Sequence, residues 1–302
     1  MQALLAHPAF QAAVAPFLVT LVLALFLRRW GLVWQGLALI AGLLVTVWLT
    51  TGLSLQPLTS TRKIILCSLG LPFLALLVGF LNRRATQILP GLLAALLLAV
   101  AAIWVAWPVL SRQHGWALWA MAGQVAVYAA VVGGALLSLT GGRMFANEGG
   151  RSDASLTAGA RFAQQGGAIL ALAIGTGAAA IIGASALYGQ LAFAVAASTG
   201  ALLLAALLFW QWKSEESVAN LQPMALLAAA VPLGLLGAAA SIYAKLPAIA
   251  LLFLACAPLV VRIPLVSAAN PWLRLTLATL LASVPVVPAL WLTWQAAGPV
   301  SF

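Results

Sequence analysis

The chain has 302 residues, of which 65% are hydrophobic and 6% are charged, and its formal net charge is +10. A soluble globular domain carries about 25% charged residues, so this chain lacks the polar side chains that a water-facing surface needs. Composition therefore excludes a soluble fold and predicts a single transmembrane domain over residues 1–302. The basic residues stand singly or in pairs between apolar runs, which argues against nucleic acid as a partner and leaves the lipid bilayer.

Ten apolar segments follow one another along the chain, each a candidate for a transmembrane helix of about 20 residues. They run over residues 10–27, 32–54, 64–81, 88–110, 116–140, 166–187, 191–210, 222–243, 246–261 and 275–295. The expected fold class is therefore all-α, a polytopic integral membrane protein with about ten transmembrane helices. Residues 1–27 contain no Lys or Arg, unlike a cleavable signal peptide, so we expect the first helix to be retained.

Lys and Arg are unevenly divided between alternate loops. Ten follow the odd-numbered segments, namely Arg28, Arg29, Arg83, Arg84, Arg143, Arg151, Arg161, Lys213, Arg262 and Arg274. Four follow the even-numbered segments, namely Arg62, Lys63, Arg112 and Lys245. The positive-inside rule then predicts cytoplasmic odd-numbered loops and places both termini on the periplasmic side of a bacterial-type inner membrane.

The stretch 166–210 is long enough for one very long helix or for two short ones. We divide it at Tyr188-Gly189-Gln190, because a single crossing would move every downstream loop to the opposite side of the membrane. The loop charges would then divide eight against six, and the bias would almost disappear. A hairpin of two helices is therefore expected here.

The longest polar stretch, 141–165, divides the chain into halves 1–140 and 166–302. It is Gly-rich at first and then predicts a short cytoplasmic helix, with Ser152 or Asp153 as its N-cap. It is interpreted as a linker between two five-helix halves or as a docking site for a partner. Five helices per half would make the halves inverted relative to each other, as in many transporters.

Two segments carry small residues at every fourth position, a pattern that lets helix backbones approach closely in lipid. The stripes consist of Gly167, Ala171, Gly175, Ala179 and Gly183 in one segment, and of Ala122, Ala126, Ala130, Gly134 and Ser138 in the other. We expect both to pack in the interior or at a subunit interface of a homo-oligomer. Small residues also leave room for a substrate.

Polar side chains within the apolar segments define a candidate pathway. Gln124 and Tyr128 are four apart and share one helix face, and Gln124 is costly to leave in lipid. Pro72 lacks a backbone N–H and lies four residues after Ser68, so it predicts a local break with a freed carbonyl. No Asp or Glu falls within any predicted segment, so a carboxylate-based proton relay is not expected.

Chemical motifs are scarce in this sequence. Cys67 and Cys256 lie in apolar runs at different depths, and His7 and His114 are expected in outer loops. These residues do not form a catalytic, metal or cofactor pattern, so we expect neither an enzyme nor a bound cofactor.

Three functions are compatible with this architecture. The first is a transporter or permease for a small molecule, favoured by length, helix number and prolines at mid-membrane. The second is a non-catalytic membrane subunit or assembly factor of a larger inner-membrane complex, favoured by the packing stripes. The third is an enzyme on a lipid-linked substrate, which the shortage of acids and histidines disfavours.

Overall fold

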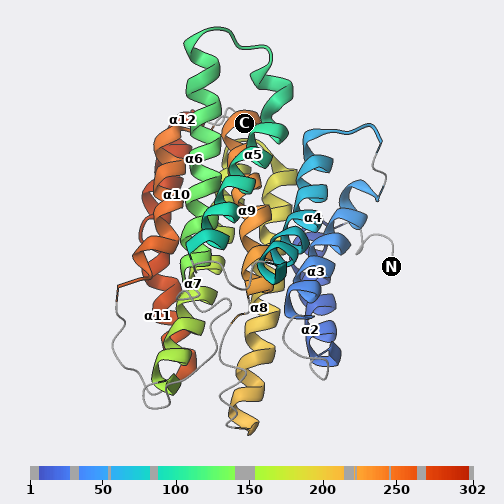
Figure 1. Cartoon of the computed structure of the whole chain (residues 1–302), viewed down its shortest axis with the longest axis vertical. Coiled ribbons are helices and arrows are strands. Elements are labelled where there is room, and N and C mark those ends of the chain that lie inside the picture. The colour runs from blue at the N-terminus through green and yellow to red at the C-terminus, as the bar shows by residue number, and fades with distance from the viewer. Residues whose placement is uncertain are drawn as a thin grey trace.

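The computed structural model describes residues 7–27, 34–53, 56–81, 88–139, 154–213, 221, 223–244, 246–263 and 270–298. Every regular element over these residues is a helix, which confirms the all-α fold class (Figure 1). The elements are η1 (Phe10–Val14), α2 (Ala15–Leu27), α3 (Trp34–Thr51), α4 (Ser60–Leu81), α5 (Ile88–Leu110), α6 (Trp116–Ser138), α7 (Ala154–Ile182), α8 (Ala186–Lys213), α9 (Pro223–Tyr243), α10 (Ala248–Val260), α11 (Pro271–Ser283) and α12 (Val286–Ala297).

Several of these helices are long and apolar enough to cross a membrane. Within the described ranges there are seven, over residues 10–27, 92–110, 116–138, 161–182, 186–208, 224–243 and 271–297. Two further apolar helices are shorter, over residues 35–51 and 248–260. These apolar helices are consistent with a polytopic membrane protein. Their length and composition support seven crossings among the described residues, so the expected number of about ten is not confirmed.

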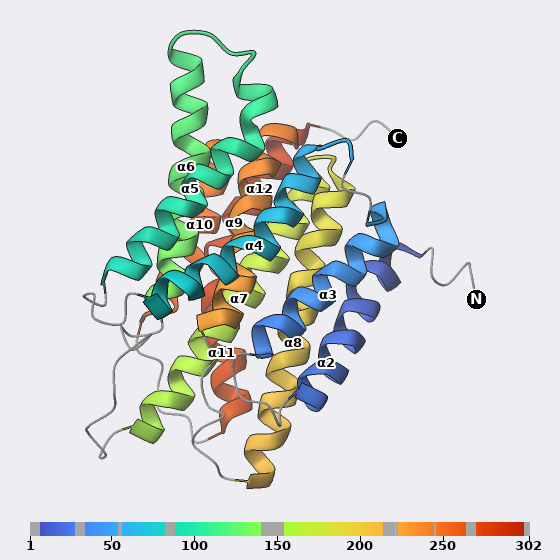
Figure 2. The same cartoon turned by 45° about the vertical axis from the view of Figure 1, so that its right-hand side comes forward.

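The central element of the bundle is α9. Every residue from Met224 to Ala240 is buried, and α3, α4, α5, α6, α7 and α8 all pack against this helix (Figure 2). The segment consists of Ala, Leu, Gly, Val, Met and one Pro, so it is apolar on all sides and narrow. A helix without a polar face is stable only where other helices surround it, which explains its position.

The small-residue stripe on α7 lies at close helix contacts. A Cβ added to Gly167 would stand 2.7 Å from the backbone nitrogen of Thr279 in α11, and one added to Gly175 would stand 2.6 Å from Val286 in α12. At Gly183, in the turn just after α7, it would meet the carbonyl oxygen of Ala244, just after α9, at 2.3 Å. The α7 stripe thus holds the C-terminal helices against the core.

The stripe on α6 is less enclosed. Ala126 and Gly134 are half-buried, and a Cβ added to Gly134 would stay 3.9 Å from Ala95 of α5, an ordinary contact distance. α6 packs mainly on α5 and α9 and touches α7 only slightly. The two stripes therefore serve different helix pairs.

The stretch 166–210 forms two helices, as expected, but the turn comes earlier. It occupies residues 183–185, where Ala184 has a φ of 68°, and Tyr188 already lies inside α8. The expected linker 141–165 is also helical from Ala154 onward, because α7 runs unbroken to Ile182. The prediction of a separate short helix is therefore wrong over residues 154–165. The expected N-caps at 152 and 153 lie outside the described residues.

The expected single segment 275–295 is divided in two. α11 ends at Ser283 and α12 begins at Val286, with a turn at 284–285. Pro285 and Pro288 cannot donate the helical hydrogen bonds expected at those positions, which accounts for the break. Pro72 does not have this effect, since α4 continues through it.

The contact at Gly167 gives a direct test of helix packing. Gly167→Ala should lower the free energy of unfolding by about 1–3 kcal/mol, because backbone atoms of α11 cannot move aside easily. Gly200→Ala is the matched control, since an added Cβ there meets nothing within 4 Å. Unfolding in detergent should separate the two variants, and equal stability would contradict the packing described here.

Candidate functional site

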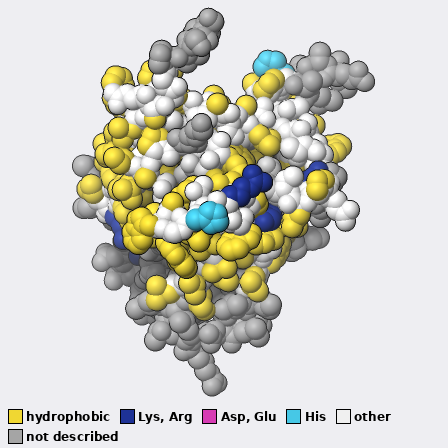
Figure 3. Space-filling view, turned by 90° about the horizontal axis from the view of Figure 1, so that it is seen from above, with side chains coloured by type: hydrophobic (Ala, Val, Ile, Leu, Met, Phe, Trp, Pro, Cys, Tyr) yellow, Lys and Arg dark blue, Asp and Glu magenta, His cyan; other side chains and the backbone are white. Residues whose placement is uncertain are grey.

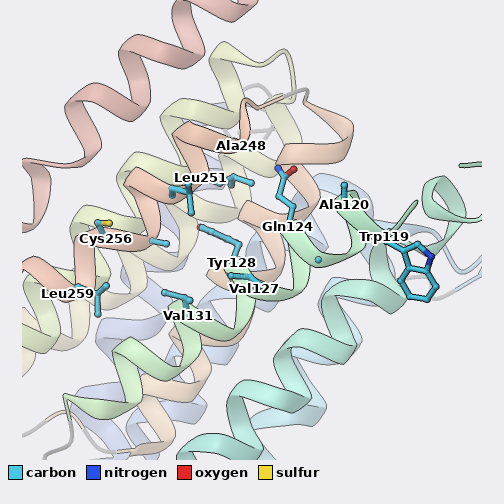
Figure 4. A pocket seen from close by; sticks show the side chains of 13 residues that line it. Trp119, Ala120, Gln124, Val127, Tyr128, Val131, Ala248, Leu251, Cys256 and Leu259 are labelled. Carbon is cyan, nitrogen blue, oxygen red and sulfur yellow. The ribbon is translucent and has the colours of Figure 1, made fainter. Parts of the chain in front are cut away.

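A groove of about 460 Å³ runs between α6 and α10 (Figure 4). Its α6 wall is formed at positions 119, 120, 123, 124, 127, 128 and 131, and its α10 wall at 248, 251, 252, 255, 256 and 259. Both sets follow the three-and-four spacing of one helix face. A volume of this size is in the range that small-molecule sites occupy.

Small residues make the groove possible. Ala120 and Gly123 on α6 stand beside Ala248 on α10, and a Cβ added to Gly123 would meet no atom within 4 Å. At the far end, the Arg262 side chain donates to the Ser138 hydroxyl and links the chain just after α10 to the end of α6. α6 and α10 are thus connected at this end, and the groove separates them along the rest of their length.

The groove opens toward the outer surface of the bundle. Val127 is 56% exposed and Leu252 is 61% exposed, and both belong to its walls. Such apolar side chains face lipid in a membrane-spanning bundle. An apolar molecule in the bilayer could therefore reach this groove without crossing water.

Gln124 is the main polar group that faces this space. Its side chain is half-buried and points into the groove near Ala248 (Figure 4). It makes no hydrogen bond with any other described residue. An amide left unpaired in an apolar surrounding costs about 1–3 kcal/mol, so this group is suited to a ligand that can hydrogen-bond.

Tyr128 forms the floor of the groove. It is 4% exposed, and its ring lies so close to Gly237 of α9 that an added Cβ would stand 2.3 Å from the phenol oxygen. The phenol reaches toward the Thr176 hydroxyl of α7. Neither oxygen has a hydrogen-bond partner of good geometry. The Tyr128 ring therefore lies between the groove and two buried, unsatisfied hydroxyls, its own and that of Thr176.

The other two candidate residues lie elsewhere. Ser68 and Pro72 are buried on α4, which packs on α9 away from the groove. The Ser68 hydroxyl has no partner in the described part of the chain. The four predicted pathway residues thus form two pairs in two places, with α9 contacting both α4 and α6.

Sequence reasoning missed the α10 wall, because its residues carry no polar signal. Leu251, Leu252 and Cys256 became relevant only when α10 was placed beside α6. Cys256 is half-buried there, whereas Cys67 is buried on α4, and both thiols are free. Gly237 and Thr176, which position Tyr128, also give no individual signal in the sequence.

His7 and His114 are exposed, as expected for residues in loops. No group of three His, Cys, Asp or Glu side chains that could hold a metal occurs within the described residues. The groove itself presents the Gln124 amide within a mostly apolar lining.

Comparison with known proteins adds no family to this description. No protein-family model matches the chain, no curated protein is detectably similar to it, and no solved structure matches its fold. What can be assigned is a class, namely an all-helical protein with several apolar helices that are compatible with location in a membrane.

The contact between Tyr128 and Gly237 can be tested by coupling. Gly237→Ala should destabilise the protein by about 1–3 kcal/mol, because the new methyl group overlaps the Tyr128 ring. In a Tyr128→Leu background the same change should cost clearly less, which a double-mutant cycle in detergent measures. Gly234→Ala, which faces Leu98 instead, should show no such coupling to Tyr128.

Proposed function

We propose that this protein is a membrane transporter or permease for a small apolar or amphipathic molecule that enters laterally through the groove between α6 and α10. The observation that carries the proposal is the Gln124 amide, held in an apolar groove without a described protein partner. A substrate with an apolar body and one hydrogen-bonding group would fill the groove and satisfy this amide.

The broken helix beside the groove supports movement. α10 packs on α12, and α12 is separated from α11 by the turn at 284–285. Discontinuous helices near the middle of a membrane domain are common in transporters, where they allow one part to tilt against another. Here such a tilt would change the distance between α10 and α6 and so the width of the groove.

The mechanism proposed does not use a carboxylate proton relay. All four acids of the chain (Glu148, Asp153, Glu215 and Glu216) lie outside the predicted segments and outside the described residues. We propose a non-enzymatic role on the same ground, since catalysis on a lipid-linked substrate generally needs acids, histidines or a metal at one interface.

We further propose that all ten helical units cross the membrane, with α11 and α12 forming one crossing. Successive units run in alternating directions in the bundle, which supports ten crossings (Figure 1). The ten-to-four division of Lys and Arg supports cytoplasmic odd-numbered loops, periplasmic termini and a bacterial inner membrane.

A second function is favoured by a different observation. The helix α9 is apolar and buried over residues 224–240, which suits a non-catalytic subunit or assembly factor of a membrane complex as well as a carrier. In that role the groove would receive an apolar helix of the partner, with the Gln124 amide as a polar contact.

Blocking the groove should abolish transport. In Leu252→Trp the larger ring would occupy the space between α10 and α6. Leu96→Trp on α5 is the matched control, because both leucines are 61% exposed and only Leu252 lines the groove. Untargeted mass spectrometry of cells and medium, with and without expression, identifies compounds whose distribution depends on the protein. The Leu252→Trp variant should lose that dependence, and the Leu96→Trp variant should keep it.

Removing the amide gives a finer test. Gln124→Leu keeps the size of the side chain but leaves the polar group of the substrate unpaired, so transport of the same compounds should fall by about 10- to 100-fold. If expression changes no compound and a stoichiometric partner protein co-purifies in mild detergent, the transporter proposal fails in favour of the complex-subunit role.

The orientation has its own test. A green fluorescent protein fused after residue 302 should remain dark, and alkaline phosphatase fused there should be active, if the C-terminus is periplasmic. Fusions at 213, after an odd-numbered segment, should give the opposite pair of results. Fluorescence at both sites would exclude the proposed topology.

A further inference from the structure

A second polar cluster lies at the upper end of the bundle as drawn in Figure 1. It is built on the first turn of α4, which begins at Ser60 and includes Lys63. Lys63 is only 8% exposed, although it was expected as a loop residue that marks the outer side of the membrane. A buried cation in a membrane domain is costly and is commonly part of a functional site.

The immediate surroundings of Lys63 satisfy its ammonium group only in part. The Nζ donates to the carbonyl oxygen of Trp104 at 3.0 Å and lies 4.9 Å from the centre of the Trp104 ring. This carbonyl is available because Pro108, four residues later in α5, has no N–H to donate to it. An ammonium has three donors, so two of them have no acceptor among the described residues.

Among the described residues, the charge of Lys63 also has no counter-charge. None of the described residues is Asp or Glu, and the first turn of α4 contains no acid. Viewed from this end, Lys and Arg side chains gather near the middle of the surface beside a histidine (Figure 3). The positive end of the α4 dipole adds to the same field.

Two hydroxyl groups lie at the same end of α4 as this cation. The Ser60 and Tyr243 hydroxyls are 2.6 Å apart, and Ser60 lies three residues before Lys63 on the same face of α4. The Tyr188 ring lies 6.1 Å from the Tyr243 ring. An ammonium with free donors, two hydroxyls and a helix N-terminus together provide the groups that bind anionic oxygen atoms.

We propose that this upper end of α4 binds a phosphate group, with Lys63 supplying the charge and Ser60 and Tyr243 supplying hydroxyl hydrogen bonds. Trp104 and Trp107 are both partly exposed at the same end of α5, where indole rings mark the level of lipid head groups. A phosphatidylglycerol head group would therefore reach the cluster from the bilayer, and free phosphate would reach it from water. The site is independent of the groove between α6 and α10.

Lipid retention tests the proposal directly. The full chain, purified in mild detergent, is mixed with equal amounts of phosphatidylglycerol and phosphatidylcholine and examined by native mass spectrometry. The wild type should retain phosphatidylglycerol preferentially, and Lys63→Met should bind it at least tenfold more weakly, the scale of one charge-assisted hydrogen bond. Arg112→Met, which removes an exposed charge at the same end, is the matched control and should change little. Equal retention by Lys63→Met and Arg112→Met would overturn the proposal.

Two further variants keep the test decisive. Tyr243→Phe removes one hydroxyl without changing charge or ring size, and it should weaken retention several-fold even if Lys63→Met does not purify. Unchanged retention in Tyr243→Phe would overturn the hydroxyl contribution. Leu252→Trp should retain the lipid normally, so failure of the groove proposal and failure of this one can be told apart.

A parallel arm distinguishes the two sources of phosphate. Thermal unfolding of the lipid-free protein is measured with inorganic phosphate and with chloride at equal ionic strength. Stabilisation by phosphate that is lost in Lys63→Met, without selective lipid retention, would assign the site to free phosphate. The absence of both effects would overturn the proposal altogether.

Discussion

Every backbone N–H and C=O inside a bilayer must be bonded within the protein, because the hydrocarbon core offers no water to replace a missing partner. Helices meet this requirement except where a proline or an irregular turn removes a donor. The structure compensates at two such places. Lys63 donates to the Trp104 carbonyl that Pro108 leaves free, and Thr46 donates to the carbonyl of Gln11 in the π-helical turn before Pro16. Side chains from neighbouring helices thus complete backbones that are irregular.

The same constraint explains how the helices are arranged. Lipid tails are as apolar as the side chains of these helices, so the hydrophobic effect does little to bring the helices together in a bilayer. Close packing of small residues holds them together instead. α9 is surrounded on all sides because it is apolar and narrow, and α7 reaches α11 and α12 through glycines. Gln165 adds a polar connection, since its amide donates to Leu139 at the end of α6 and accepts from the N–H of Leu221 just before α9.

Much of this architecture could be predicted from the sequence, since each apolar run is a direct consequence of the bilayer. The face shared by Gln124 and Tyr128 could also be predicted, because four-residue spacing is a local property. The break at 284–285 was not predicted, because residues 275–295 are apolar on both sides of it and proline breaks some membrane helices and not others. The wall formed by α10 depends on which helices become neighbours, and an apolar face carries no information about its partner. Lys63 was assigned to a loop because its charge stands at the edge of an apolar run, whereas its burial depends on Trp104, about 40 residues away.

The contacts of α7 have a consequence for how the protein is made. Gly167 touches the backbone of α11 about 110 residues further along the chain. During synthesis α7 therefore enters the membrane well before the helix that covers its glycine face has left the ribosome. Until then this face must be occupied by lipid or by the insertion machinery, and α11 and α12 cover the α7 glycines only when they emerge. Loss of α11 and α12 would accordingly disturb the packing of a helix in the middle of the sequence.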